Sequence, residues 1–136
     1  MGEAQLDLLE RLLARLDEYA AKVSRSDLEL DFDAWLMVSR ALELSAQCCV
    51  DLAMECVAKR ALGAPETYRD AFVRLAAASV ITPELALKME GWAGLRNVLA
   101  HLYTQIDLDR MYQALVEDKG ALREFARVAA GELHPR

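Results

Sequence analysis

Residues 94–103 of this chain read Gly-Leu-Arg-Asn-Val-Leu-Ala-His-Leu-Tyr. Apolar side chains recur here at the spacing of an α-helix, and with the next isoleucine they form one stripe: Leu95, Leu99, Leu102 and Ile106. On the opposite side, Arg96 and Tyr103 lie nearly in line, because they are seven residues apart. Asn97 and His101 are four residues apart and therefore neighbours. The stretch predicts an amphipathic helix whose polar face carries a cation, an amide, an imidazole and a phenol.

The composition predicts helices for the rest of the chain as well. Hydrophobic residues make up 54% of the 136 residues and charged residues 28%, which is typical of an ordered globular protein. The chain has only three prolines and six glycines, and its long stretches are rich in leucine and alanine. We therefore expect an all-α fold in which residues 1–136 form a single domain.

Periodicity and capping residues place the expected helices and the segments between them. Thr82-Pro83 is a helix start, Gly63-Ala64-Pro65 is a helix end, and Asp107 is a cap for the last helix. The predicted helices cover residues 3–23, the stretch from Asp31 or Asp33 to about residue 60, residues 66–79, the stretch from residue 83 into the motif, and about residues 108–130. Residues 24–31 are predicted as a linker and residues 131–136 as a tail. Such an order of elements predicts an up-down bundle of four to five helices with mostly antiparallel neighbours.

Charge and cysteine content exclude several classes of function. The net charge of −6 argues against a basic surface for nucleic acids, so any nucleic-acid chemistry would need a local cationic site. Three cysteines without CxxC spacing (Cys48, Cys49 and Cys56) predict buried free thiols in preference to a zinc or redox centre. The N-terminus lacks the pattern of a signal peptide, and no apolar run is long enough for a membrane span, so we expect a cytoplasmic protein.

The motif also resembles a known pattern. Arg96, His101 and Tyr103 form the pattern R-x4-H-x-Y, and Gly94-Leu95 precedes it while Ile106-Asp107 follows it. In an all-α chain of this length, this pattern resembles the HEPN superfamily, and within it the HepT toxins that are encoded beside MntA-type nucleotidyltransferase antitoxins. The resemblance extends over most of the chain, including the long second helix and the segment from Gly63 through Tyr68 to Pro83.

The resemblance implies a bundle of HEPN type and a ribonuclease toxin of a type VII toxin–antitoxin pair. It implies a homodimer in which two motifs face each other, and RNA cleavage that needs neither metal nor cofactor. Arg96 and His101 match the catalytic pair of the family, and Asn97 matches the polar residue that follows the arginine. Tyr103 matches the tyrosine that the partner nucleotidyltransferase modifies with AMP.

These residue types suit RNA cleavage without a metal. The reaction removes a proton from a 2′-hydroxyl and protonates the leaving 5′-oxygen, and a histidine serves either step near neutral pH. Arg96 would bind the phosphate and stabilise the charge that develops on it, while Asn97 would orient His101 or donate to a phosphate oxygen. We expect a 2′,3′-cyclic phosphate as the product.

Simpler interpretations of the same residues stay open at the level of sequence. His101 alone is the pattern of a hydrogen-bonded structural histidine, Asn97 could only hold a helix pair together, and Tyr103 could be an interface aromatic. Two other functions also fit the chain. It could be a non-catalytic subunit that binds a substrate or nucleotide for a nucleotidyltransferase, or a helical interaction module whose polar face builds a dimer.

Overall fold

The computed structural model describes residues 2–135, and the elements over this range are helices. Met1 and Arg136, the two ends of the predicted domain, lie outside the described residues. The helices are α1 (Glu3–Lys22), α2 (Arg25–Leu30), α3 (Phe32–Lys59), α4 (Tyr68–Ala77), α5 (Pro83–His101), η1 (Tyr103–Gln105), α6 (Leu108–Gln113), the π-helical η2 (Ala114–Asp118) and α7 (Lys119–Leu133). The predicted all-α bundle is confirmed. Within residues 2–135, no helix has the length and apolar character of a membrane span.

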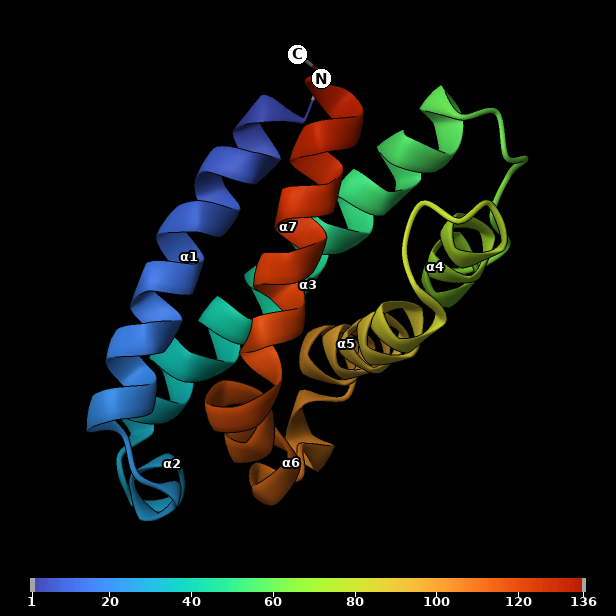
Figure 1. Ribbon diagram of the computed structural model, residues 1–136. Helices are drawn as coiled ribbons and strands as arrows, with labels where there is room; N and C mark the ends of the chain where they lie inside the picture. Colours follow the sequence, from blue (N-terminus) through green and yellow to red (C-terminus); the bar gives the residue numbers. More distant parts are fainter. Residues whose placement is uncertain (1, 136) are drawn as a thin grey trace.

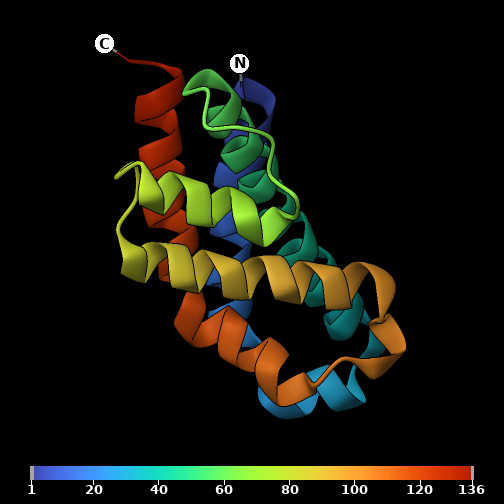
Figure 2. The ribbon, with the colours of Figure 1, turned by 90° about the vertical axis from the view of Figure 1, so that its right-hand side faces the viewer.

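The long helices α1, α3 and α7 pack against one another, and a helical pair crosses them. Helices α1 and α3 run antiparallel and α7 packs against both (Figure 1). Helices α4 and α5 form an antiparallel pair that lies across the long helices (Figure 2). Because α5 contacts both α3 and α4, the motif helix has packed neighbours on two sides.

The core is centred on α3, which buries residues from Ala34 to Val57. The largest fully buried side chains come from the helices around it, with Trp92 on α5, Phe72 on α4 and Phe125 on α7. Phe72 and Phe125 meet edge to face, with 5.2 Å between their ring centroids. This contact joins α4 of the crossing pair to α7, one of the long helices.

The segment predicted as a linker, residues 24–31, contains helix α2 instead. Ser24 and Asp27 form a capping box in which each side chain accepts a hydrogen bond from the backbone of the other residue, at 3.1 Å and 2.9 Å. Leu28 is buried in the core and anchors this short helix. The many acidic residues of this segment are typical of a loop, so neither the capping box nor the buried leucine is evident from the sequence.

The third helix begins later than the sequence predicts. Thr67 caps α4, and the helix therefore starts at Tyr68.

The C-terminal helix differs from the prediction in two ways. It is interrupted by the π-helical η2, and it continues to Leu133, because the Leu133 side chain is buried and ties the end of the helix to the core. Trp92 reaches the interruption, where its Nε1 donates a hydrogen bond of 3.2 Å to the carbonyl oxygen of Asp118. The buried tryptophan therefore connects the motif helix to the π-helical segment.

We predict that Trp92→Phe lowers the free energy of unfolding by about 2 kcal/mol, because it removes the donor to the Asp118 carbonyl and leaves a small cavity. Urea denaturation followed by circular dichroism measures the change. Trp35→Phe is the matched control, since Trp35 is only half-buried and stacks on Phe32 at the protein surface. Equal losses in the two variants would contradict this account.

Candidate functional site

Helix α5 positions the motif through its buried face. The hydroxyl of Thr82 accepts a hydrogen bond of 3.1 Å from the backbone of Leu85, and Pro83 occupies the first helical position. The buried residues of the helix fix its rotation: Leu85, Ala86, Met89, Trp92, Ala93, Leu95 and Leu99. With that face against the core, Asn97 and His101 lie on the exposed side. Leu102 does not continue the buried stripe, because it lies beyond the end of the helix and is 47% exposed.

Arg96 is half-buried at the junction of α5, α3 and α4, and neutral groups hold it there. Its Nε donates a hydrogen bond of 2.6 Å to Oε1 of Gln47 on α3. Its Cζ lies 5.3 Å from the ring centroid of Tyr68, the first residue of α4, in a cation–π contact. The guanidinium is thus oriented by two helices, and neither contact neutralises its charge.

Asp51 fixes the amide of Gln47 in turn. Gln47 Nε2 donates a hydrogen bond of 2.7 Å to Oδ1 of Asp51, one helical turn further along α3. Because a carboxylate only accepts and a guanidinium only donates, the amide of Gln47 has one orientation that satisfies both neighbours. Asp51, Gln47 and Arg96 therefore form a directed chain of hydrogen bonds from α3 to the motif.

The distal end of Arg96 brings the other two motif residues together. Its Nη1 lies 3.1 Å from Oδ1 of Asn97 and 3.4 Å from Nε2 of His101. Since a guanidinium has no acceptor, the second contact requires an unprotonated Nε2, with the imidazole proton on Nδ1. Among residues 2–135, Nη2 of Arg96 has no hydrogen-bond partner, which leaves its two donors available to an anion.

Tyr103 lies apart from this cluster. Helix α5 ends at His101, so the expectation that Arg96 and Tyr103 lie in line along one helix is wrong. The chain must reverse direction before α6, whose cap Asp107 is extended and accepts hydrogen bonds from two backbone amides, at 2.9 Å and 3.3 Å. Tyr103 falls in this reversal as the first residue of η1, where it is 59% exposed. Its phenol is accessible from solvent.

Sequence reasoning did not single out Gln47 and Tyr68 as neighbours of the motif. Gln47 and Asp51 are spaced by four residues on a helix that is otherwise mostly apolar, which is the one signal in the sequence for a polar chain on that face. Tyr68 carries no such signal. Its contact with Arg96 depends on how α4 packs against α5, which the order of residues alone does not specify.

The three cysteines are buried and free, as the sequence predicts. Burial raises the pKa of Cys48 and of Cys56 to about 11, and it raises the pKa of Cys49 as well. Thiols with such pKa values remain protonated near neutral pH and are poor nucleophiles and poor metal ligands. Residues 2–135 contain no group of three or more histidine, cysteine and acidic side chains placed to hold a metal ion.

Comparison with known proteins agrees with the motif and the fold. Residues 9–129 match a family described as ribonuclease HepT-like. The chain is 32% identical over 113 residues to the tRNA nuclease HepT of Aphanizomenon flos-aquae, covering 83% of this chain and 76% of that protein. It is 28% identical over 107 residues to the mRNA nuclease HepT of Shewanella oneidensis, covering 79% and 80%.

A solved structure extends this similarity to three dimensions. The tri-AMPylated HEPN toxin of Shewanella oneidensis, in complex with its MNT antitoxin, superposes with a TM-score of 0.83. The two chains are 25% identical over 92% of each. With the family match over most of its length, the long helices of the same bundle and the R-x4-H motif at the end of α5, this chain belongs to the HepT-like ribonuclease family.

Proposed function

We propose that this protein is the RNA-cleaving toxin of a HEPN/MNT toxin–antitoxin pair and acts in the cytoplasm. The arrangement of Arg96 carries the proposal: its guanidinium is fixed by uncharged groups, contacts the Nε2 of His101 and keeps free donors for a phosphate. Membership of the HepT-like family and the naming of two relatives as tRNA and mRNA nucleases support RNA as the substrate.

The mechanism that we propose needs two copies of the motif across a homodimer. When RNA binds, Nη1 of Arg96 moves from Nε2 of one His101 to the phosphate. This Nε2 then accepts the proton of a 2′-hydroxyl, whose oxygen forms a bond to the adjacent phosphorus. The bond from phosphorus to the 5′-oxygen breaks, and the His101 of the second subunit, protonated before the reaction, donates a proton to that oxygen. The products are a 2′,3′-cyclic phosphate and a 5′-hydroxyl. Arg96 stabilises the charge on the phosphate through Nη1 and Nη2, and Oδ1 of Asn97 accepts a hydrogen bond from Nη1 and so helps to orient the guanidinium.

Control by the antitoxin would act on Tyr103. In this proposal an MntA-type nucleotidyltransferase transfers AMP from ATP to the phenolic oxygen of Tyr103, and pyrophosphate leaves with the proton of the phenol taken up by solvent. The exposure of Tyr103 and the tri-AMPylated state of the Shewanella oneidensis relative support this step. The attached group adds negative charge and bulk two residues after His101, where it would exclude RNA from the cationic site.

The two histidines of the chain allow a matched test of catalysis. We expect purified wild-type protein to degrade RNA in the presence of EDTA and to leave 2′,3′-cyclic phosphate ends. His101→Ala should lower the rate at least a hundredfold, because the proton acceptor is lost. His134→Ala should cleave normally, since that residue lies in the exposed tail. Newly formed 3′-hydroxyl ends would contradict the mechanism, and intact RNA with wild type would favour a non-catalytic binding subunit.

Gln47→Leu tests the support of Arg96. We predict a decrease in kcat of roughly tenfold to a hundredfold, because the guanidinium loses the acceptor that orients it while the side chain keeps a similar volume. The measurement is RNA cleavage under single-turnover conditions. Gln113→Leu, at an exposed position of α6, is the control. A wild-type kcat in Gln47→Leu would exclude an orienting role for this amide.

Tyr103→Phe tests the proposed site of modification. Incubated with the partner nucleotidyltransferase and ATP, the wild-type protein should gain AMP and lose RNA cleavage. Tyr103→Phe should gain no AMP and stay active, because the phenolic oxygen is absent. Intact-mass spectrometry and an RNA cleavage assay read the two effects, with Tyr112→Phe as a half-buried control. Silencing of Tyr103→Phe to the wild-type extent would show that control operates elsewhere.

A further inference from the structure

A second arginine lies against the motif helix, one residue after Tyr68 on α4. The guanidinium of Arg69 rests on the backbone of α5 at Gly94, where a methyl group added to the glycine would overlap Nη2 of Arg69. The first turn of α4 therefore contacts α5 with two consecutive side chains, Tyr68 at Arg96 and Arg69 at Gly94. Gly94 costs the helix some intrinsic stability, and the space that it leaves is filled by a cation from the neighbouring helix.

Arg69 is a cation without a counter-charge. Among residues 2–135 it has neither an ion pair nor a hydrogen bond, and its side chain is exposed. Nearby arginines differ in this respect: Arg74 is 2.9 Å from a carboxylate oxygen of Asp70, and Arg110 is 3.0 Å from one of Asp118. The chain has a net charge of −6, so an unpaired guanidinium against the motif helix is a local excess of positive charge.

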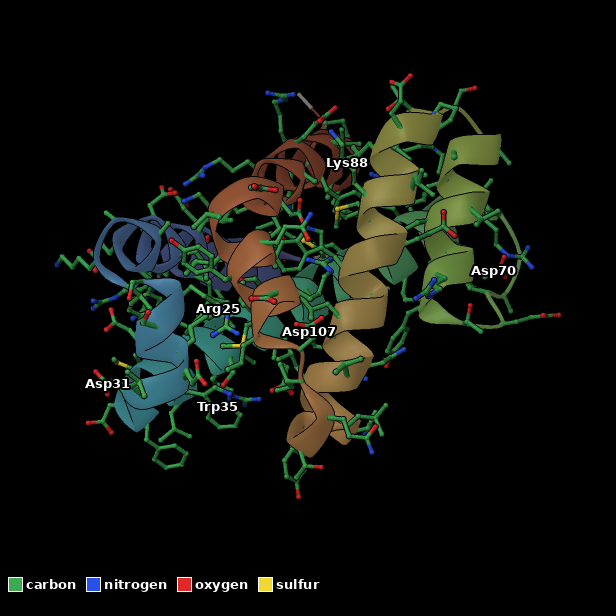
Figure 3. All side chains as sticks on the ribbon, turned by 90° about the horizontal axis from the view of Figure 1, so that it is seen from below. Arg25, Asp31, Trp35, Asp70, Lys88 and Asp107 are labelled. Atoms are coloured by element: carbon green, nitrogen blue, oxygen red, sulfur yellow. The ribbon has the colours of Figure 1, made fainter. Side chains whose placement is uncertain are left out.

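Arg69 lines a groove of about 400 Å³ that runs along α5. Helix α5 lies between α4 and α6, and Asp107 stands at the start of α6 beside it (Figure 3). Gly91, Gly94 and Val98 line the groove on the α5 side, and Arg110 lines it from α6. The carboxylate of Asp107 also faces the groove, but it already accepts two backbone hydrogen bonds as the cap of α6.

Two motif residues follow the groove residue Gly94 along one side of the helix. Gly94, Asn97 and His101 are spaced by three and four residues, so they follow one another on the exposed face of α5. At 1.5 Å per residue, Gly94 lies about 4.5 Å from Asn97 and about 10 Å from His101 along the helix axis. A strand bound at Arg96 and His101 would therefore pass Arg69 with its neighbouring phosphates.

We propose that Arg69, seated on Gly94, binds a non-scissile phosphate of the RNA substrate next to the phosphate that is cleaved. The proposal rests on the RNA cleavage proposed above and extends it with a second anion site. A guanidinium binds phosphate through paired donors, and neither donor pair of Arg69 has another partner in the described chain. The site explains how an acidic protein binds a polyanion, because the two cations at α5, Arg69 and Arg96, act together over a short stretch of RNA.

The first experiment measures binding of total tRNA in a His101→Ala background, which keeps the RNA intact. We expect Arg69→Ala to raise Kd about tenfold and to make the slope of log K against log salt shallower by about 0.7, the value for one lost phosphate contact on a single strand. Arg69→Lys should retain much of the affinity because it keeps the charge. Arg127→Ala, which removes an exposed arginine of α7 outside this groove, should bind like the parent protein.

Gly94→Ala gives an independent test that does not remove a charge. The added methyl group displaces Arg69, so Kd should rise as far as in Arg69→Ala, while the melting temperature stays equal or increases because alanine favours a helix. Gly131→Ala is the matched control, since Gly131 lies in α7 outside this groove and a methyl group there meets nothing within 4 Å. When Gly94→Ala and Arg69→Ala are combined, Kd should rise no further than in either single variant.

The outcomes separate this proposal from the proposed function. If wild-type protein cleaves RNA and Arg69→Ala keeps the parental Kd and salt slope, the second anion site is overturned and the ribonuclease function stands. If Gly94→Ala weakens binding equally with and without Arg69, the glycine acts by another route and the coupling is overturned. RNA that stays intact with wild type overturns the proposed function and this site with it.

Discussion

The hydrogen bond between Arg96 Nε and Gln47 Oε1 is the contact on which the site depends. It joins the motif helix to the central helix α3, and it orients a cation without bringing a negative charge into contact with it. Several other arginines of this protein are held by carboxylates, as Arg60 is by Glu132 at 2.7 Å. A carboxylate at position 47 would hold Arg96 equally well, but it would offset the positive charge that an RNA phosphate requires. The amide separates Asp51 from the guanidinium and transmits its orienting effect through a hydrogen bond.

The crossing pair α4 and α5 makes the fold and the site parts of one arrangement. The contact between Phe72 and Phe125 sets α4 against the long helices, and the first turn of α4 then brings Tyr68 and Arg69 to α5. A change in the packing of these aromatic rings would therefore move the groups around Arg96 without touching the motif itself. The acidic net charge makes the site depend further on this packing. Attraction for a polyanion must come from a few cations, and the packing of α4 and α5 places them.

Much of the fold can be predicted from capping residues and from the spacing of side chains along single helices. Thr82-Pro83, Asp31 and Asp107 cap helices where expected, and the spacing of Arg96, Asn97 and His101 predicts that they meet. The misplaced features depend on tertiary contacts. Helix α2 needs Leu28 to reach the core, and the position of Tyr103 depends on the reversal that α6 imposes. The contacts of Tyr68 with Arg96 and of Arg69 with Gly94 form between two helices. The periodicity of a single helix therefore cannot predict them.

The π-helical turn at Ala114–Asp118 has a consequence for the kinds of mutation that this chain tolerates. Such a turn holds one more residue than an α-helical turn, so it sets the register of everything after it. Loss of a single residue there would convert this wide turn into a regular α-helical turn, and α7 would keep the face that it turns to the core. A deletion within the regular part of α7 has no wide turn to absorb it and would rotate the residues after it by about 100°. Such a deletion just after Lys119 would turn Phe125 out of the core and Arg123 away from Asp17 on α1. A one-codon deletion in the π-helical turn should therefore be tolerated better than one in the helix that follows it.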